Sequence, residues 1–204
     1  MPKTVNFGVW EDGVFIGVVV YGHGASPKIG CPYGLNVGEI VELVRVALKE
    51  HTVEVSRIVA VSLRLLRKSS PGVRLVVSFA DPEQDHHGGI YQAGGWIYTG
   101  RSADSTRVVT ADGSTIHRRA YVGKNFGAKK TPMPPGSKMV RCEGKHRYLM
   151  PLDAAMRLDV AHLAMPYPKR PPSIVDALGT QSRDGSSNLT DGLQTSEGDA
   201  PDEA

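Results

Sequence analysis

The sequence predicts a mixed α/β domain of the α+β type, with helices flanking a twisted mixed sheet. Three observations predict this class. Several short β-rich runs are separated by turn signals, and residues 53–68 show apolar positions at helical spacing. The run at 73–79 is almost wholly apolar, which is typical of a strand buried on both faces. With 204 residues, the chain is long enough for one domain with its own core.

The individual elements follow from local patterns. Glu11-Asp12-Gly13 lies between two β-rich runs and is a hairpin signal. The glycine-rich and proline-containing segment 22–38 predicts an irregular loop, and Thr52 or Ser56 is the candidate N-cap of the helix. In chain order, the expected elements are strands at 5–10, 14–21 and 39–48, a helix at 53–68, a strand at 73–79, a short helix carrying Tyr91 and Gln92, strands at 98–100, 107–110, 115–121 and 145–150, and a short helix at 153–165.

The segment 75–100 carries the strongest functional signal. A buried strand ends in a loop rich in Ser, Asp and His, which is how α/β proteins build ligand sites. Asp81 follows this strand, where burial is expected to raise its pKa and let it accept a proton or bind a metal; the alternative is a turn residue ahead of Pro82. Ser78 is expected either to orient a substrate or to be an ordinary core hydroxyl.

Two further features of the chain suggest polar chemistry. Arg45 interrupts an apolar strand and predicts a partner, either Asp81 or a bound phosphate or carboxylate, unless it faces outward. His86 and His87 lie near Asp81 and form a candidate metal site of the two-histidine, one-carboxylate type. A pair of surface histidines is the alternative.

The charge of +3 is distributed very unevenly. Residues 1–117 hold 11 basic and 11 acidic side chains, residues 118–170 hold 12 and 3, and residues 171–204 hold 1 and 7. The basic block predicts a polyanion partner, with the phosphate backbone of DNA as the leading candidate and a solvated surface as the alternative. The cations proposed for this surface are Arg118, Arg119, Lys124, Lys129, Lys130, Arg141, Lys145 and Arg147.

The remaining composition sets limits on the class of protein. We expect a catalytic domain over 1–170 and a disordered acidic tail over 171–204, because the tail has too few apolar residues to offset the entropy of ordering. No apolar stretch has the length of a membrane span, and the start of the chain lacks a signal-peptide pattern. Two cysteines far apart favour a reducing cytoplasm over a disulfide scaffold.

Several phrases, taken in order, resemble the phage-encoded Mom family of DNA-modification proteins. They are Cys31-Pro-Tyr-Gly-Leu, Val41-Glu-Leu-Val-Arg-Val-Ala-Leu, Ser56-Arg-Ile-Val, Leu63-Arg-Leu-Leu, Val77-Ser-Phe-Ala-Asp-Pro, His87-Gly-Gly-Ile-Tyr-Gln-Ala, Trp96-Ile-Tyr-Thr-Gly, Asp112-Gly-Ser-Thr-Ile-His-Arg-Arg and Lys145-His-Arg-Tyr-Leu. The resemblance covers residues 30–150. It implies a fold like that of the GNAT acyltransferases, double-stranded DNA as substrate, and conversion of adenine N6 to a carbamoylmethyl adduct that protects phage DNA in the cytoplasm of the bacterial host from restriction.

The resemblance also implies roles for particular groups. Tyr91 matches the tyrosine with which GNAT enzymes often protonate a leaving thiolate, and packing alone is the other interpretation. A modified base has to leave the duplex, and Tyr98, Trp96 or Phe126 is expected to stack on it. Acetyl-CoA or a related acyl donor and iron are the implied cofactors. However, residues 49–56 lack the glycines of a pyrophosphate-binding loop.

Two other functions compete with DNA modification. An acetyltransferase acting on a small-molecule or protein amine would share the fold and would bind CoA tightly. A DNA-binding protein without catalysis would share the basic block and would keep its biological effect after Asp81→Ala.

Overall fold

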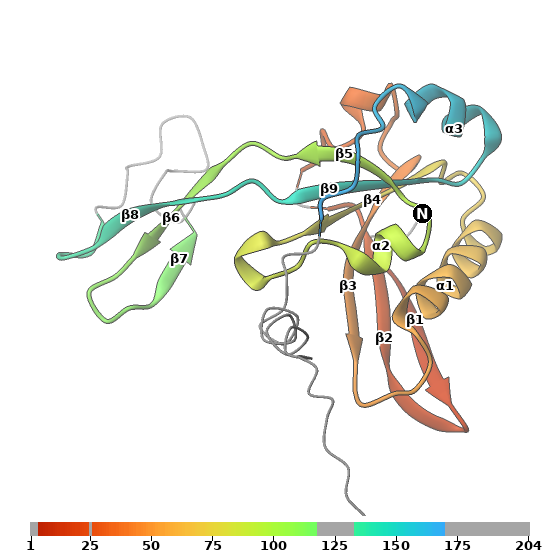
Figure 1. Ribbon diagram of the computed structural model, residues 1–204, viewed down its shortest axis with the longest axis horizontal. Helices are drawn as coiled ribbons and strands as arrows, with labels where there is room; N and C mark the ends of the chain where they lie inside the picture. The colour runs from red at the N-terminus through yellow and green to blue at the C-terminus, as the bar shows by residue number, and fades with distance from the viewer. Residues whose placement is uncertain (1–3, 25, 118–132, 170–204) are drawn as a thin grey trace, which may run out of the picture. The chain divides into compact units, whose positions relative to one another are not determined.

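The computed structural model describes residues 4–24, 26–117 and 133–169 (Figure 1). Its strands are β1 (Thr4–Glu11), β2 (Val14–Gly22), β3 (Ile40–Leu48), β4 (Leu75–Ala80), β5 (Ile97–Arg101), β6 (Ser105–Val109), β7 (Thr115–His117), β8 (Lys138–Cys142) and β9 (His146–Pro151). Its helices are α1 (Val55–Ser69), α2 (Gly89–Ala93) and α3 (Ala154–Ala161), with 3-10 turns η1 (Cys31–Tyr33) and η2 (Pro82–Gln84). The predicted tail 171–204 lies outside these residues.

Six strands form the main sheet, in the order β1-β2-β3-β4-β9-β5. The three strands β1, β2 and β3 are antiparallel neighbours, and β3 is parallel to β4 through the crossover helix α1. The last strand of the chain, β9, lies between β4 and β5 and is antiparallel to both. The predicted mixed sheet is therefore confirmed, although its strand order could not be read from local sequence patterns.

The main sheet is covered on both faces, which explains the apolar character of β4. On one face, Val76 packs in a cluster with Leu63 and Leu66 of α1 and with Tyr91 of α2. On the other face, Leu75 packs with residues of α3 and of the loop before β3. Successive residues of a strand point to opposite faces, so a strand buried on both sides needs apolar residues at nearly every position.

Helix α1 confirms the predicted helix at 53–68, with a shift of one or two residues at its ends. Its buried residues recur at helical spacing, and Leu66 is fully buried; full burial of a leucine contributes roughly 1.5–3 kcal/mol. The predicted caps were wrong. Glu54 is the N-cap and makes no side-chain capping bond, whereas the Thr52 hydroxyl donates to Glu11 Oε1 at 2.7 Å.

A smaller sheet, in the order β7-β6-β8, extends from the ends of β5 and β9. Strand β8 was not predicted, because Lys138-Met-Val-Arg-Cys142 is short and mostly exposed. The two sheets are joined where residues 102–104 and 143–145 run side by side. There, Ser102 N–H donates to Lys145 O at 2.8 Å and Gly144 N–H donates to Asp104 Oδ1 at 2.9 Å.

Glycine is required at position 144 by this close contact between the two connecting segments. A Cβ atom at Gly144 would lie 1.8 Å from the carbonyl oxygen of Ser102, which cannot move without breaking the junction. We expect Gly144→Ala to lower the free energy of unfolding by roughly 1–3 kcal/mol, the range for an overpacked site. Denaturant titration measures this change. Gly72→Ala is the control, because nothing lies within 4 Å of its added methyl group, and an equal loss in both variants would contradict the prediction.

Candidate active site

The candidate site begins where the parallel strands β3 and β4 separate. The two strands pair at only three positions, from Ile40 with Leu75 to Glu42 with Val77. Beyond them, β3 continues to Leu48 and β4 to Ala80 without further pairing between these two described strands. A bulge in β3 opposite Val20 and Tyr21 adds to the divergence. The two backbones therefore diverge at the carboxyl end of β4, where the sequence predicted a site, and we call this divergence the strand opening.

Ser78 and Tyr91 meet inside this opening. Ser78 Oγ lies 2.8 Å from the Tyr91 hydroxyl oxygen and 3.0 Å from the carbonyl oxygen of Leu43. A serine hydroxyl has one proton, and a carbonyl can only accept. Ser78 is the donor in both contacts, so its single proton is shared between the Leu43 carbonyl and the Tyr91 hydroxyl. The structure thus brings together two predicted site residues that are 13 positions apart in the chain.

Tyr91 also forms a wall of a pocket. This pocket, of about 310 Å³, lies between the end of β4 and the start of α2, and its lining includes Phe79, His86, His87 and Ile90. The Tyr91 side chain is nearly buried, and burial raises the pKa of its hydroxyl despite the opposing effect of the hydrogen bond with Ser78. Tyr91 is therefore protonated at neutral pH and contacts both the pocket and the strand opening.

Asp81 occupies the end of β4, but its electrostatics differ from the expectation. Its carboxylate accepts a 3.1 Å hydrogen bond from Glu83 N–H as the N-cap of η2, and its Oδ2 lies 2.8 Å from Lys145 Nζ. Burial alone raises the pKa of Asp81, but the hydrogen bonds from Lys145 and Glu83 outweigh it and leave this pKa below its usual value. The predicted raised pKa was wrong, because Lys145 is distant in the sequence.

The ion pair of Asp81 gives a definite pH dependence of stability. Because the folded pKa lies below the usual 3.8, the contribution of the pair is present above that value and is lost as the pH falls through the folded pKa. Lys145→Met is expected to lower stability near neutral pH by about 1 kcal/mol or less, since the pair is partly exposed. Thermal unfolding of both proteins across the acid range measures this, and a difference that persists in strong acid would contradict the assignment.

Arg45 does not take part in this arrangement. Its side chain is exposed on β3 and makes no ion pair or hydrogen bond within the described part of the chain. Asp81, the partner suggested for it, is paired with Lys145 instead. The outward-facing alternative therefore describes Arg45 in this structure.

The aromatic residues near the site form a packed layer. The Tyr148 ring lies between those of Tyr91 and Tyr98, with centroid distances of 5.0 and 5.2 Å. The Tyr148 hydroxyl donates to His87 O at 2.5 Å, which holds the loop that forms the pocket. Tyr98 was expected to stack on a flipped base, but it is nearly buried, as is Trp96. Phe126, the third candidate, lies outside the described residues.

His146 is a residue of this layer that sequence reasoning missed. Its Nδ1 lies 2.9 Å from the Tyr98 hydroxyl, and the imidazole is nearly buried. Burial, with the nearby charge of Arg101, lowers the pKa of His146 and favours the neutral ring. The phrase Lys145-His-Arg-Tyr contained the only signal, and it pointed to DNA contacts rather than to a buried histidine.

The cations expected to hold DNA are engaged within the protein wherever the structure describes them. Arg141 pairs with Asp104 at 2.6 Å, and Lys145 pairs with Asp81. Arg147 donates to Thr99 Oγ1 at 2.8 Å. The other five members of the set, Arg118, Arg119, Lys124, Lys129 and Lys130, lie outside the described residues.

The implied metal finds little support from the geometry. Among residues 4–24, 26–117 and 133–169, no three His, Cys, Asp or Glu side chains converge as a metal-binding group. His86 and His87 line the pocket, while the carboxylate of Asp81 is directed to Lys145 and to Glu83 N–H. The predicted set of His86, His87 and Asp81 is therefore not assembled as a ligand cluster.

The pyrophosphate of CoA fits poorly at the start of α1. The backbone N–H groups of Thr52 and Val53, which precede this helix, are both occupied by the carboxylate of Glu11, at 2.9–3.2 Å. These bonds, led by that of the Thr52 hydroxyl, lower the pKa of Glu11 and keep it ionised. An internal anion thus occupies two of the backbone donors that precede the helix, and residues 49–56 contain no glycine that would allow a closer backbone approach.

The fold and the site together define the class of protein to which this chain belongs. Two antiparallel hairpin strands, a third antiparallel strand, a crossover helix and a diverging parallel strand form a GNAT-like domain with a site at the divergence. The chain belongs to the Mom protein family, whose model matches residues 1–169. No curated protein matches the sequence significantly. None of the helices in the described residues is long and apolar enough to cross a membrane.

Several solved structures show a distant likeness to this chain. A Bacillus subtilis acetyltransferase in complex with CoA is 15% identical, covers 74% of this chain and 78% of its own, and has a TM-score of 0.39. FeeM, an N-acyl amino acid synthase from uncultured soil microbes, is 13% identical, with coverages of 79% and 75% and a TM-score of 0.41. A putative GNAT-family acetyltransferase from Desulfovibrio desulfuricans is 14% identical, with coverages of 74% and 70% and a TM-score of 0.36.

Proposed function

We propose that this protein is a transferase that modifies N6 of adenine in double-stranded DNA, with a carbamoylmethyl-type group as the product. The observation that carries the proposal is the Tyr91-lined pocket at the end of β4, in a chain of the Mom family. The pocket volume of about 310 Å³ lies at the lower end of small-ligand sites, which span roughly 300–1,000 Å³. A single base extruded from the duplex is a ligand of this kind.

The transfer requires two proton movements. The N6–carbon bond forms while the bond between that carbon and the leaving group of an electrophilic donor breaks, and its electron pair stays with the leaving group. N6 loses a proton, and we assign its acceptance to Asp81, which the low pKa keeps ionised at neutral pH. We assign protonation of the leaving group to Tyr91, whose raised pKa keeps its proton available. Ser78 orients the Tyr91 hydroxyl.

The DNA is held, in this proposal, by the basic block that begins at Arg118. Arg141, Lys145 and Arg147 are part of it, and their ion pairs and hydrogen bonds within the protein leave only their remaining donors for phosphate. Phosphate contacts would set the position of the duplex, and the pocket would select the base.

The experiment is expression in a bacterium, digestion of total DNA to nucleosides, and mass spectrometry of deoxyadenosine. A mass-shifted deoxyadenosine that depends on the protein is the expected result. Unmodified deoxyadenosine from cells that contain folded protein would overturn the proposal. In that case, modification of a small-molecule or protein amine would support the acetyltransferase alternative, and DNA binding alone would support the non-catalytic one.

A further inference from the structure

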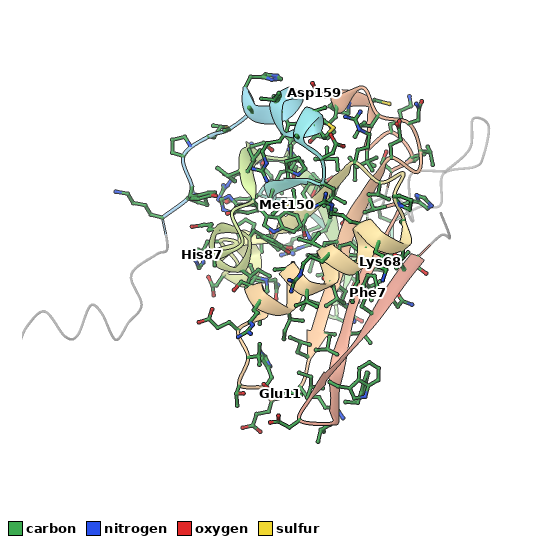
Figure 2. All side chains as sticks on the ribbon, turned by 90° about the vertical axis from the view of Figure 1, so that its right-hand side faces the viewer. Phe7, Glu11, Lys68, His87, Met150 and Asp159 are labelled. Carbon is green, nitrogen blue, oxygen red and sulfur yellow. The ribbon has the colours of Figure 1, made fainter. Side chains whose placement is uncertain are left out.

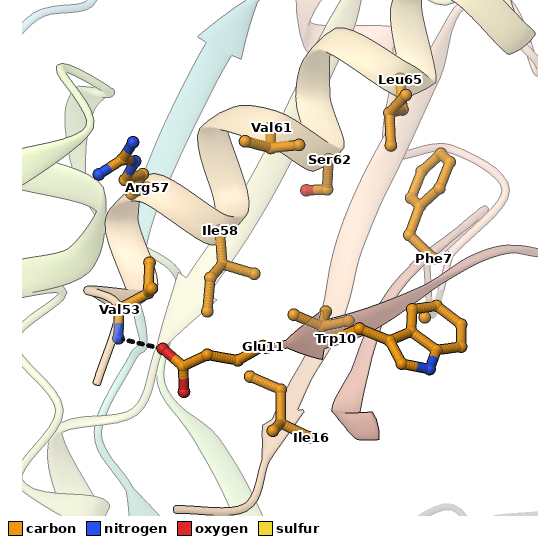
Figure 3. Close-up of a pocket in the computed structure, with 12 residues that line it drawn as sticks. Phe7, Trp10, Glu11, Ile16, Val53, Arg57, Ile58, Val61, Ser62 and Leu65 are labelled. Carbon is orange, nitrogen blue, oxygen red and sulfur yellow. Dashed lines mark hydrogen bonds between the residues drawn. The ribbon is translucent and has the colours of Figure 1, made fainter. Parts of the chain in front are cut away.

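A second surface of the molecule lies on the far edge of the main sheet, between β1 and α1. Here a groove of about 260 Å³ is lined mainly by apolar side chains, including Phe7, Trp10, Val61 and Leu65 (Figure 3). Trp10 is 62% exposed and packs against Phe15 at the hairpin tip. Exposed large apolar side chains gathered in one groove are typical of an interaction surface.

Strand β1 is also open along one side. It is the edge of the six-stranded sheet and, among the described residues, pairs only with β2. From Thr4 to Trp10 it has neither a charged side chain nor a proline. These are residues with which edge strands usually avoid pairing with other chains. Its bulge at Val9 and Trp10 lies near one end, so the pairing from Thr4 to Val9 is regular. An extended strand is the partner that fits such an edge.

Charges are separated along this surface. Helix α1 runs antiparallel to β1, so its start lies near Glu11 and its end lies near Phe7, where Figure 2 places Lys68. The end of the helix carries exposed cations without an ion pair in the described part of the chain, namely Arg64, Arg67 and Lys68. The opposite end of the surface carries exposed carboxylates that also lack an ion pair there, namely Asp12, Glu50 and Glu54, and these with Glu11 outnumber the cations Lys49 and Arg57 at the same end.

We propose that two copies of this chain associate through β1, antiparallel, about a twofold axis. This arrangement continues the sheet from one copy into the other, and it places the acidic end of each copy against the basic end of its partner. The apolar groove beside each edge is covered at the same time. A twofold contact requires a self-complementary surface, and the opposite charges at the two ends of β1 supply it. DNA fits less well, because one end of this surface is acidic and its middle is apolar.

The experiment is a charge exchange, followed by light scattering during size-exclusion chromatography of the full chain. The basic-end variant carries Arg64→Glu, Arg67→Glu and Lys68→Glu, and the acidic-end variant carries Asp12→Lys and Glu54→Lys. Each variant alone is expected to be monomeric at concentrations where the wild type is dimeric. An equimolar mixture of the two is expected to form a heterodimer, because both contacts are then complementary. Control changes on other surfaces, Lys138→Glu with Arg157→Glu, are expected to leave the wild-type dimer intact.

The mixture distinguishes a broken interface from a misfolded variant, since only folded chains can recover the dimer. A wild type that remains monomeric throughout the micromolar range would overturn the proposal. A dimer that both charge-changed variants retain would also overturn the proposal. Separate monomers in the equimolar mixture would overturn it as well. If the wild type is monomeric and the basic-end variant loses DNA affinity, this face binds DNA and the proposal is wrong.

Discussion

Replacement of Asp81 by asparagine is expected to reduce the formation of modified deoxyadenosine by about 10²–10⁴-fold, the usual contribution of a positioned general base. Asparagine can still accept the hydrogen bond from Glu83 N–H that starts η2, so the fold of the loop should be kept. Only the charge and the proton-accepting capacity are lost. The measurement is the fraction of modified deoxyadenosine in DNA from cells with equal amounts of soluble protein.

Asp12→Asn is the matched control for this experiment. Asp12 lies in the turn between β1 and β2, is exposed, does not line the pocket, and has a left-handed backbone conformation with φ of 50°, which asparagine adopts as readily as aspartate. Its replacement should leave activity unchanged. Lys145→Met separates the two roles of Asp81, which are proton acceptance and the ion pair with Lys145. If Asp81 acts only by holding Lys145, then Asp81→Asn and Lys145→Met lose activity equally. Activity of Asp81→Asn within a few-fold of wild type would contradict its assigned role.

The second large effect is expected from Tyr91→Phe, which removes one oxygen atom and keeps the ring in the core. Without the hydroxyl, the leaving group loses its proton donor, so we expect activity to fall by about 10²–10⁴-fold. Stability should fall by only about 1 kcal/mol, the net value of one hydrogen bond, because Ser78 can still donate to Leu43. Modified deoxyadenosine and denaturant unfolding, measured on the same preparations, separate these effects.

Tyr98→Phe is the control for Tyr91→Phe. Tyr98 belongs to the same aromatic layer, is equally buried, and also loses one hydrogen bond on replacement, that with His146. It should lose similar stability and keep most of its activity. Equal activity in the two variants would indicate that the Tyr91 hydroxyl contributes only to packing.

The parts of the fold that could be predicted are those encoded by local patterns. The apolar run of β4 and the helical spacing of α1 both appear where expected, because the burial of a whole strand or of one helix face leaves a mark in adjacent positions. Strand β8 was missed because its residues are mostly exposed and include two cations. The insertion of β9 between β4 and β5 depends on pairing between distant segments, which leaves no local mark.

The candidate site was predictable to the same extent. Ser78 was selected for its place on the buried strand and Tyr91 for its place on the short helix that follows, and in the structure a hydrogen bond joins the two side chains. The low pKa of Asp81 could not be foreseen, since Lys145 is brought to it only by the pairing of β4 with β9. His146 was missed for the same reason, because its partner Tyr98 is 48 residues away.

The meeting of Ser102 with Lys145 has an evolutionary consequence. The chain leaves the main sheet at Ser102 and returns to it beside that residue at Lys145, since β5 and β9 are neighbours there. A segment with such closely spaced ends can gain or lose residues at small entropic cost, because loop closure depends only weakly on length. Relatives can therefore gain, lose or exchange residues in this segment while the strands of the main sheet, and the pocket at the end of β4, stay in place.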